Sequence, residues 1–171
     1  NTKSKKNIVI KIGTTSIIKN NKVDSSLLNK LVDIVKDFSK QYNFVIVTSG
    51  AVGLGASKLN YKTRPKSLKK LQVASAVGQI ELVNQYEKVF NKSKMNIAQV
   101  LITKNLIDDR EQFVNTTQAL NELLSEGIVP VVNENDVVAT EELKFGDNDR
   151  LSAIVSIVVD AEKLIIITNK E

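Results

Sequence analysis

Residues 44–55 read Phe44-Val45-Ile46-Val47-Thr48-Ser49-Gly50-Ala51-Val52-Gly53-Leu54-Gly55. The first part is a short apolar run rich in β-branched side chains, without alternation of polar and apolar residues. Such a run is typical of a strand covered on both faces of its sheet. The glycine-rich part that follows predicts a tight turn from this strand into a helix. A strand that leads directly into a helix is the building unit of an α/β fold.

Strands and helices alternate on both sides of this stretch. Short apolar runs predict further strands at 8–12, 97–102, 128–132 and 164–168. Apolar residues at helical spacing predict helices at 24–42, 66–91, 108–125 and 149–160, with a shorter helical segment ending near residue 60. Residues 133–148 form a polar segment that we expect to be a loop. The alternation predicts an α/β protein with a mainly parallel sheet sandwiched by helices.

Three residues are expected to define helix ends. Asp24, or else Ser25, is placed to cap the helix at 24–42. Asp108 has Glu111 three residues later, which is the spacing of a capping box. Gly127 is expected just past the end of the helix at 108–125.

The composition excludes several kinds of chemistry. With Cys 0 and His 0, the chain has no disulfide, no thiolate nucleophile, no histidine triad and no Cys or His metal site. No apolar run approaches the roughly 20 residues of a membrane span, so we expect no membrane insertion and a cytoplasmic location. Lys+Arg 24 against Asp+Glu 19 leaves a net charge of +5, with scattered lysines and only 5% aromatic residues. Nucleic acid is therefore not the expected partner.

Ligands of open α/β sheets bind beyond the carboxyl ends of the strands. Lys11 and Gly13 end the first predicted strand and place a cation beside open backbone N–H groups, as a phosphate site requires. The alternative is a solvent-facing lysine and an ordinary turn. The spacing of Gly50 and Gly55 resembles a P-loop, but Ala56 stands where the phosphate-binding lysine belongs. A P-loop is therefore excluded, and this turn either binds a ligand or only joins strand to helix.

Two polar clusters follow later in the chain, at 133–136 and 146–149. Amide groups both donate and accept hydrogen bonds, so together with carboxylates they can bind a ligand that carries both a carboxylate and an ammonium group. The alternative is a solvated loop, because Asn and Asp favour turns. No residue is an obvious general base. That absence favours a nucleophile that is already ionised, such as a carboxylate attacking a phosphoryl group.

Five stretches together resemble the glutamate 5-kinases, a branch of the amino acid kinase family. They are Val9-Ile10-Lys11-Ile12-Gly13-Thr14-Thr15, Val47-Thr48-Ser49-Gly50-Ala51, Asp109-Arg110-Glu111-Gln112-Phe113, Val131-Val132-Asn133-Glu134-Asn135-Asp136 and Gly146-Asp147-Asn148-Asp149. The resemblance implies a three-layer α/β/α fold and ATP-dependent, Mg²⁺-assisted phosphorylation of the γ-carboxylate of L-glutamate, the first step of proline biosynthesis. Inhibition by proline and assembly into a homo-oligomer are also implied.

The resemblance also implies roles for individual residues, with no metal ligand among them. Lys11 would stabilise the transferring phosphoryl group, and Asp149 would organise the catalytic lysines. The residues expected to contact glutamate or lie close to it are Ser49, Asp136, Asn148, Asn133 and Asp147. Those expected near phosphate or nucleotide are Lys11, Gly13, Gly50, Thr168 and Asn169.

Two departures from the family pattern bear on the nucleotide site. The family usually has Asp where this chain has Asn169, and it continues well past Glu171. Residues 1–171 are therefore expected to be the N-terminal, amino-acid-binding portion of a kinase domain whose nucleotide-binding remainder is absent and which could be inactive alone. The open alternatives are a sibling such as N-acetylglutamate kinase and a non-catalytic amino-acid-binding module.

Overall fold

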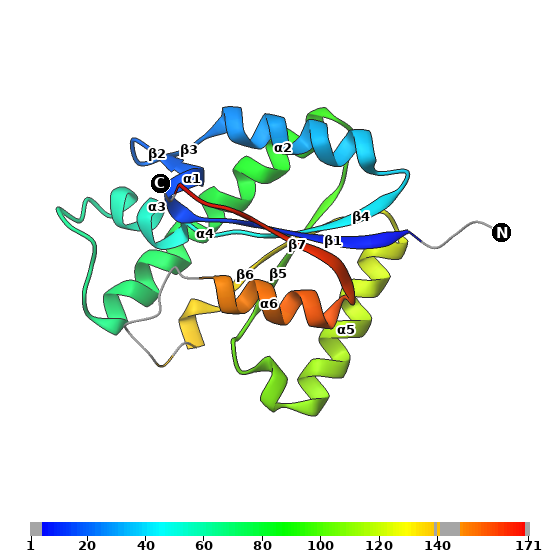
Figure 1. Cartoon of the computed structure of the whole chain (residues 1–171). Coiled ribbons are helices and arrows are strands. Elements are labelled where there is room, and N and C mark those ends of the chain that lie inside the picture. Colours follow the sequence, from blue (N-terminus) through cyan, green and yellow to red (C-terminus); the bar gives the residue numbers. More distant parts are fainter. Residues whose placement is uncertain (1–4, 139, 141–147, 170–171) are drawn as a thin grey trace.

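A computed structural model describes residues 5–138, 140 and 148–169 (Figure 1). Its centre is a five-stranded sheet in the order β5-β6-β4-β1-β7, with parallel neighbours. The strands are β1 (Lys6–Ile12), β4 (Tyr42–Val47), β5 (Ile97–Ile102), β6 (Val129–Glu134) and β7 (Ala161–Ile167). The helices are α1 (Thr14–Ile17), α2 (Ser25–Phe38), α3 (Ala51–Lys58), α4 (Leu68–Lys92), α5 (Arg110–Ser125) and α6 (Asp149–Val158), with 3-10 turns η1 (Leu106–Asp108) and η2 (Asp136–Val138). The predicted α/β fold is confirmed.

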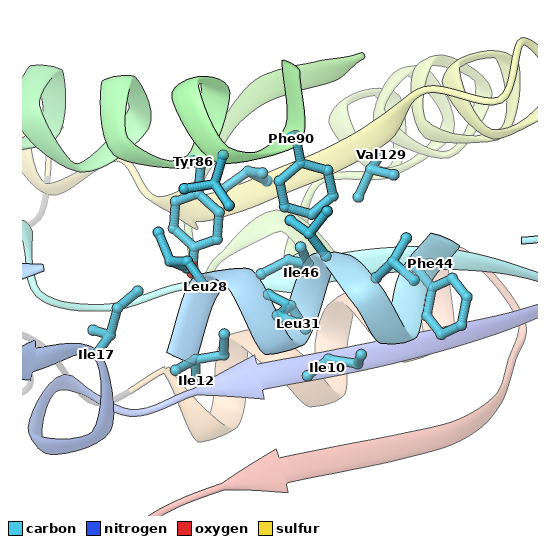
Figure 2. Close-up of a cluster of buried hydrophobic side chains, with 14 of the residues drawn as sticks. Ile10, Ile12, Ile17, Leu28, Leu31, Phe44, Ile46, Tyr86, Phe90 and Val129 are labelled. Atoms are coloured by element: carbon cyan, nitrogen blue, oxygen red, sulfur yellow. The ribbon is translucent and has the colours of Figure 1, made fainter. Parts of the chain in front are cut away.

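Helices cover both faces of the sheet. Along β1, Ile8 and Ile10 belong to one hydrophobic core and Val9 to the other, because successive side chains point to opposite faces. The first core packs against α2 and α4, and the second against α5 and α6. Figure 1 shows α2 and α6 on opposite sides of the sheet. Figure 2 shows the first core, where Tyr86 and Phe90 of α4 lie over the strands.

Helices α3 and α4 touch through their backbones. A Cβ atom added to Gly55 would lie 1.7 Å from the carbonyl oxygen of Ala74, and one added to Gly78 would lie 1.8 Å from that of Ala51. Any larger residue at either position would push the helices apart. Gly55 of the glycine-rich stretch therefore serves helix packing.

Two of the three predicted helix ends are confirmed, and one is wrong. Asp24 caps α2 by accepting hydrogen bonds from the backbone N–H groups of residues 26 and 27. Gly127, with φ of 73°, follows the end of α5. The cap of α5 is Asp109, which accepts from the N–H of Gln112 at 3.0 Å, rather than Asp108. Asp108 is taken up by η1, so the helix begins later than predicted.

The turn after β1 holds structure that the sequence pattern did not predict. Helix α1 leads into a two-stranded hairpin of β2 (Ile18–Lys19) and β3 (Lys22–Val23). Asn20 and Asn21 form its turn with positive φ values of 50° and 59°, a conformation that Asn tolerates well. These elements are too short to show a hydrophobic period. Strand β7 also begins at residue 161 rather than 164, and β6 extends to 134, into the predicted loop.

No helix in the described part of the chain is long and apolar enough to cross a membrane.

Candidate active site

A small pocket lies at the carboxyl end of the sheet, where β4 and β6 end. It is lined by Thr14, Ser49, Gly50, Ala51, Val52, Gly53, Arg64, Asn133, Asp136 and Asn148. The residues come from the turn after β1, the start of α3, the α3–α4 connection, the end of β6 and the start of α6. The structure thus brings together five of the residues that the sequence singled out: Ser49, Gly50, Asn133, Asp136 and Asn148.

Buried amide groups form one wall of the pocket. The Nδ2 atom of Asn148 donates to the carbonyl oxygen of Thr48 at 2.5 Å and to Oδ1 of Asn133 at 2.9 Å. In turn, Nδ2 of Asn133 donates to Oε1 of Gln79 at 2.8 Å. The chain of hydrogen bonds joins α6, β6 and α4 beneath the pocket. It holds both asparagines in fixed orientations, because each amide group has defined partners.

Two pocket atoms are buried without a hydrogen-bond partner among the described residues. They are Oγ of Ser49 and Oδ1 of Asn148. Buried polar atoms are normally paired, because an unpaired one costs free energy. A ligand that offers both a hydrogen-bond acceptor and a donor would pair with both atoms. Buried polar atoms of this kind are common in binding sites, where a ligand completes their hydrogen bonds.

Asp136 is the acidic group of the pocket. Its carboxylate is buried and accepts a hydrogen bond from Oγ of Ser75 on α4. Burial raises the pKa of Asp136 to about 6, and the negative charge of Glu134 adds to the rise. The Ser75 hydrogen bond and the positive charges of Lys104 and Arg64 oppose it. A carboxylate in such surroundings gains from a cationic ligand group.

The start of α3 forms the opposite wall. Gly50 has φ of 107°, and a Cβ atom there would lie 2.9 Å from Cγ1 of Ile18, so glycine is required on both grounds. Ala51, Val52 and Gly53 follow as the first turn of α3 and line the pocket. The first N–H groups of a helix lack partners within it and carry partial positive charge. This wall is therefore suited to an anionic group.

Lys11 and Asp149 form an ion pair beside the pocket. Lys11 is buried at the end of β1, and its Nζ lies 2.7 Å from Oδ1 of Asp149. Asp149 follows the pocket residue Asn148 and begins α6. The N–H of Gly13 already donates to the carbonyl oxygen of Ile167, at 3.1 Å. A Cβ atom at Gly13 would lie 3.5 Å from the carbonyl oxygen of Ile167 and 3.7 Å from Nζ of Lys11, which is ordinary van der Waals contact.

The remaining predicted residues lie away from the pocket lining. Asn169 accepts from Oγ of Ser16 at 3.0 Å and donates through Nδ2 to the carbonyl oxygen of Thr15 at 2.8 Å. An Asp at this position could not make the second bond. Thr168 is exposed just after β7, and Asp147 lies outside the described residues.

The sequence interpretation missed several residues of this site. Thr14 and Arg64 line the pocket, with Arg64 exposed at its rim. Ser75 and Gln79 support it from α4. A signal existed for these two, because they are polar residues on the otherwise apolar face of the predicted helix. Arg64 carried no signal, since it lies in the segment read as an interruption between helices.

Residues 6–171 match the family profile described as the amino acid kinase family. This chain belongs to the amino acid kinase family. The resemblance stated from the motifs is thereby confirmed, and it covers the described pocket and the Lys11–Asp149 pair.

Within this family, the chain is similar to curated proteins named glutamate 5-kinase. The chain is 49% identical over 167 residues to glutamate 5-kinase of Prochlorococcus marinus (strain MIT 9301), covering 95% of this chain and 46% of the relative. It is 43% identical over 164 residues to glutamate 5-kinase of Caldanaerobacter subterraneus subsp. tengcongensis, covering 95% and 44%. The chain thus spans about half the length of the curated relatives it matches.

Solved structures share the fold at low sequence identity. UMP kinase from Ureaplasma parvum matches with a TM-score of 0.64 at 16% identity, covering 99% of this chain and 71% of that one. Giardia carbamate kinase matches with a TM-score of 0.63 at 15% identity, covering 98% and 74%. These likenesses support the α/β architecture of the family.

Proposed function

We propose that this chain is the amino-acid-binding part of a glutamate 5-kinase, which transfers the γ-phosphoryl group of ATP to the γ-carboxylate of L-glutamate. The names of the curated relatives and their identity over 95% of the chain support this reaction. The product would feed proline biosynthesis. Within the chain itself, the support comes from the charges and unpaired atoms of the pocket.

The observation that carries the proposal is a pocket with one carboxylate, one guanidinium and two polar atoms that have no hydrogen-bond partner among the residues described. An α-amino acid presents an ammonium and a carboxylate on one carbon. Asp136 would pair with the ammonium, and Arg64 at the rim would pair with the α-carboxylate. Oδ1 of Asn148 would accept a second hydrogen bond from the ammonium, while Oγ of Ser49 would donate to a carboxylate oxygen.

The Lys11–Asp149 pair would serve the phosphoryl transfer. The γ-carboxylate of glutamate is ionised near pH 7, so it attacks without a general base. Phosphoryl transfer then depends on positioning and on stabilising the charge of the moving group. Lys11 would supply that charge, and Asp149 would keep its ammonium group in place, as their 2.7 Å contact indicates.

ATP and Mg²⁺ are proposed as co-substrate and cofactor. The first turn of α3 is proposed to face a phosphate group, with Gly13 near it beside Lys11, and Thr168 and Asn169 are proposed to begin the nucleotide site. Among the described residues, no group of three or more acidic side chains could hold a metal ion. Mg²⁺ is proposed to enter the site together with the nucleotide phosphates. The adenine pocket is proposed to lie in the part of the relatives that this chain does not cover.

The sibling reaction, phosphorylation of N-acetylglutamate, fits the pocket less well. An acylated amine carries no charge, so Asp136 would face it as a buried carboxylate without a cation. Inhibition by proline, a homo-oligomeric state and a cytoplasmic location stay predictions from the resemblance.

The test is calorimetric titration of the natural full-length protein with L-glutamate, with L-aspartate and N-acetyl-L-glutamate as controls, followed by an assay of ATP-dependent glutamyl phosphate formation. Saturable binding of glutamate and its phosphorylation are expected. Binding without turnover would favour the non-catalytic alternative. Preference for N-acetyl-L-glutamate would contradict the proposed substrate.

A further inference from the structure

Helix α4 carries three buried polar side chains, and each of them is hydrogen-bonded to the site. Ser75 bonds to Asp136, Gln79 accepts from Asn133, and the hydroxyl of Tyr86 donates to Oγ1 of Thr48 at 2.9 Å. All three residues lie among the buried, core-facing residues of the helix. Core positions of a helix are normally apolar, because a buried polar group must be paired to avoid a cost. The three buried polar residues of α4 are thus the ones that contact Asp136, Asn133 and Thr48.

The direction of the amide chain is determined by two backbone groups. The carbonyl oxygen of Thr48 can only accept, so it requires the NH₂ group of Asn148 to face it. The N–H of Glu134 can only donate, and it donates to Oδ1 of Asn133 at 2.8 Å. The NH₂ group of Asn133 must then face Gln79, which accepts it. Among the described residues, two atoms of this chain are then left without a partner: Nε2 of Gln79, and Oδ1 of Asn148, which belongs to a residue that lines the pocket.

Ser75 acts on Asp136 in a similar way. Its hydroxyl donates to the carboxylate, which favours the ionised form. The charged groups around Asp136 come from other elements: Glu134 on β6, Lys104 after β5 and Arg64 after α3. Lys104 and Glu134 are themselves paired at 2.9 Å. Through Ser75, helix α4 thus stabilises the ionised form of the Asp136 carboxylate and holds its orientation.

We propose that Ser75 and Gln79 are positioning residues for two acceptors of the pocket, the Asp136 carboxylate and Oδ1 of Asn148. Ser75 holds the carboxylate directly, and Gln79 acts through Asn133, from whose Nδ2 it accepts. By keeping both acceptors in place, the two residues select a free ammonium group over an acylated amine. This inference rests on the proposed function, since it concerns how the same pocket distinguishes glutamate from N-acetylglutamate. A free ammonium has three donors and a charge. An acylated amine has one neutral donor, so it would leave acceptors of the pocket unpaired. The pocket should therefore reject N-acetylglutamate strongly.

The first test uses Ser75→Ala and Ser75→Thr in the natural full-length protein. The carboxyl ¹³C shift of Asp136 is titrated by NMR, and the affinity for L-glutamate is measured by calorimetry between pH 5 and pH 8. Because Ser75→Ala removes a donor to the ionised form, the pKa of Asp136 should rise and glutamate affinity at pH 6 should fall about tenfold. Ser75→Thr keeps the hydroxyl and should restore both.

The second test uses Gln79→Met, with Gln85→Met as the matched control. Gln85 lies on the same helix but bonds to Glu81 at 2.7 Å. Loss of the acceptor at position 79 leaves Nδ2 of Asn133 buried without its partner and removes one of the three hydrogen bonds that hold this amide. The affinity ratio of L-glutamate to N-acetyl-L-glutamate should therefore fall about tenfold. The control should leave the ratio unchanged.

The outcomes separate this inference from the proposed function. If the unsubstituted protein binds no amino acid, the proposed function fails and the inference fails with it. If it binds glutamate, and folded Ser75→Ala and Gln79→Met proteins keep its pH profile and its affinity ratio, only the inference is overturned. A loss of affinity without a change in the pKa of Asp136 or in the ratio would indicate a merely structural role and would also overturn it.

Discussion

The two sides of the candidate site are built in opposite ways. On the amino-acid side, Asn133 and Asn148 are 3% and 2% exposed and are joined by hydrogen bonds to α4 and to the backbone. On the phosphoryl side, buried Lys11 forms an ion pair with Asp149, whose side chain is 57% exposed. The amino-acid side is set within the fold before any ligand arrives, whereas the ion pair of the phosphoryl side reaches the surface through Asp149.

This difference indicates how the work of the site is divided. A preorganised pocket gives affinity and selectivity, because its groups need little reordering on binding. An ion pair with one exposed partner can meet a second substrate that must enter and leave, and the charge of Lys11 stabilises the transition state most. Substitutions on the two sides should therefore separate substrate affinity from turnover.

Lys11→Met should give the largest effect. Removing the charge that faces the transferring group is expected to lower kcat of the full-length enzyme about 10²- to 10³-fold, as for other transition-state donors. KM for glutamate should change little, because the buried amide wall is untouched. Steady-state kinetics check this, with Lys88→Met on the exposed side of α4 as control. A rise in KM with unchanged kcat would contradict the proposal that the phosphoryl side governs turnover and the amino-acid side governs affinity.

Asp136→Asn should act on the other side. The substitution keeps the size of the side chain and an oxygen for Ser75, but it removes the negative charge. Glutamate affinity is expected to fall by about 2–3 kcal/mol, the worth of a charged hydrogen bond. Calorimetric titration of the unsubstituted and Asp136→Asn proteins with L-glutamate at pH 8 measures this difference in affinity. Unchanged affinity would mean that Asp136 does not face the ammonium.

The same substitution should reveal the stability cost of a preorganised site. Because the pKa of Asp136 rises from 3.8 to about 6 on folding, its ionisation becomes less favourable in the folded state, and stability is lost as the pH rises between these values. Asp136→Asn is neutral at every pH and avoids this loss. Its stability relative to the parent should be about 1–2 kcal/mol greater at pH 8 than at pH 4.5. Urea unfolding at both pH values tests this, and equal differences at both would contradict it.

Asn169→Asp should have the smallest effect. It returns the residue usual in the family but removes the Nδ2 donor to Thr15, which is an exposed hydrogen bond. We expect a loss of at most about 1 kcal/mol of stability and an unchanged affinity for glutamate. Thermal unfolding and glutamate titration check both. A large loss of glutamate affinity would show that the two sides are coupled.

Much of the fold could be predicted from the sequence, because its signals are local. Continuous β-branched runs such as 44–47 predicted strands buried on both faces, and Asp24 and Gly127 marked helix ends through their own conformational preferences. Errors came where several local signals compete. Asp108 and Asp109 are both good caps, and the 3-10 turn before α5 decided between them.

The candidate site could be predicted in part. Its polar residues stood out because they follow apolar strands, and the structure brings Ser49, Asn133, Asp136 and Asn148 into one pocket. Arg64 could not be found, because its place at the pocket depends on how the α3–α4 connection folds back. Their roles toward a substrate stay proposals for the experiments above.

The sequence by itself determined which chemical groups end the strands and that the sheet is buried, since side-chain polarity and branching act over a few residues. Only the tertiary structure decided which atoms face the pocket. The amide orientations depend on bonds between Asn148 and Asn133, and between Asn133 and Gln79, which lie 54 residues apart in the chain. Burial and hydrogen-bond direction arise from segments that meet only on folding, so no local pattern could reveal that Oδ1 of Asn148 has no partner in the described part of the chain.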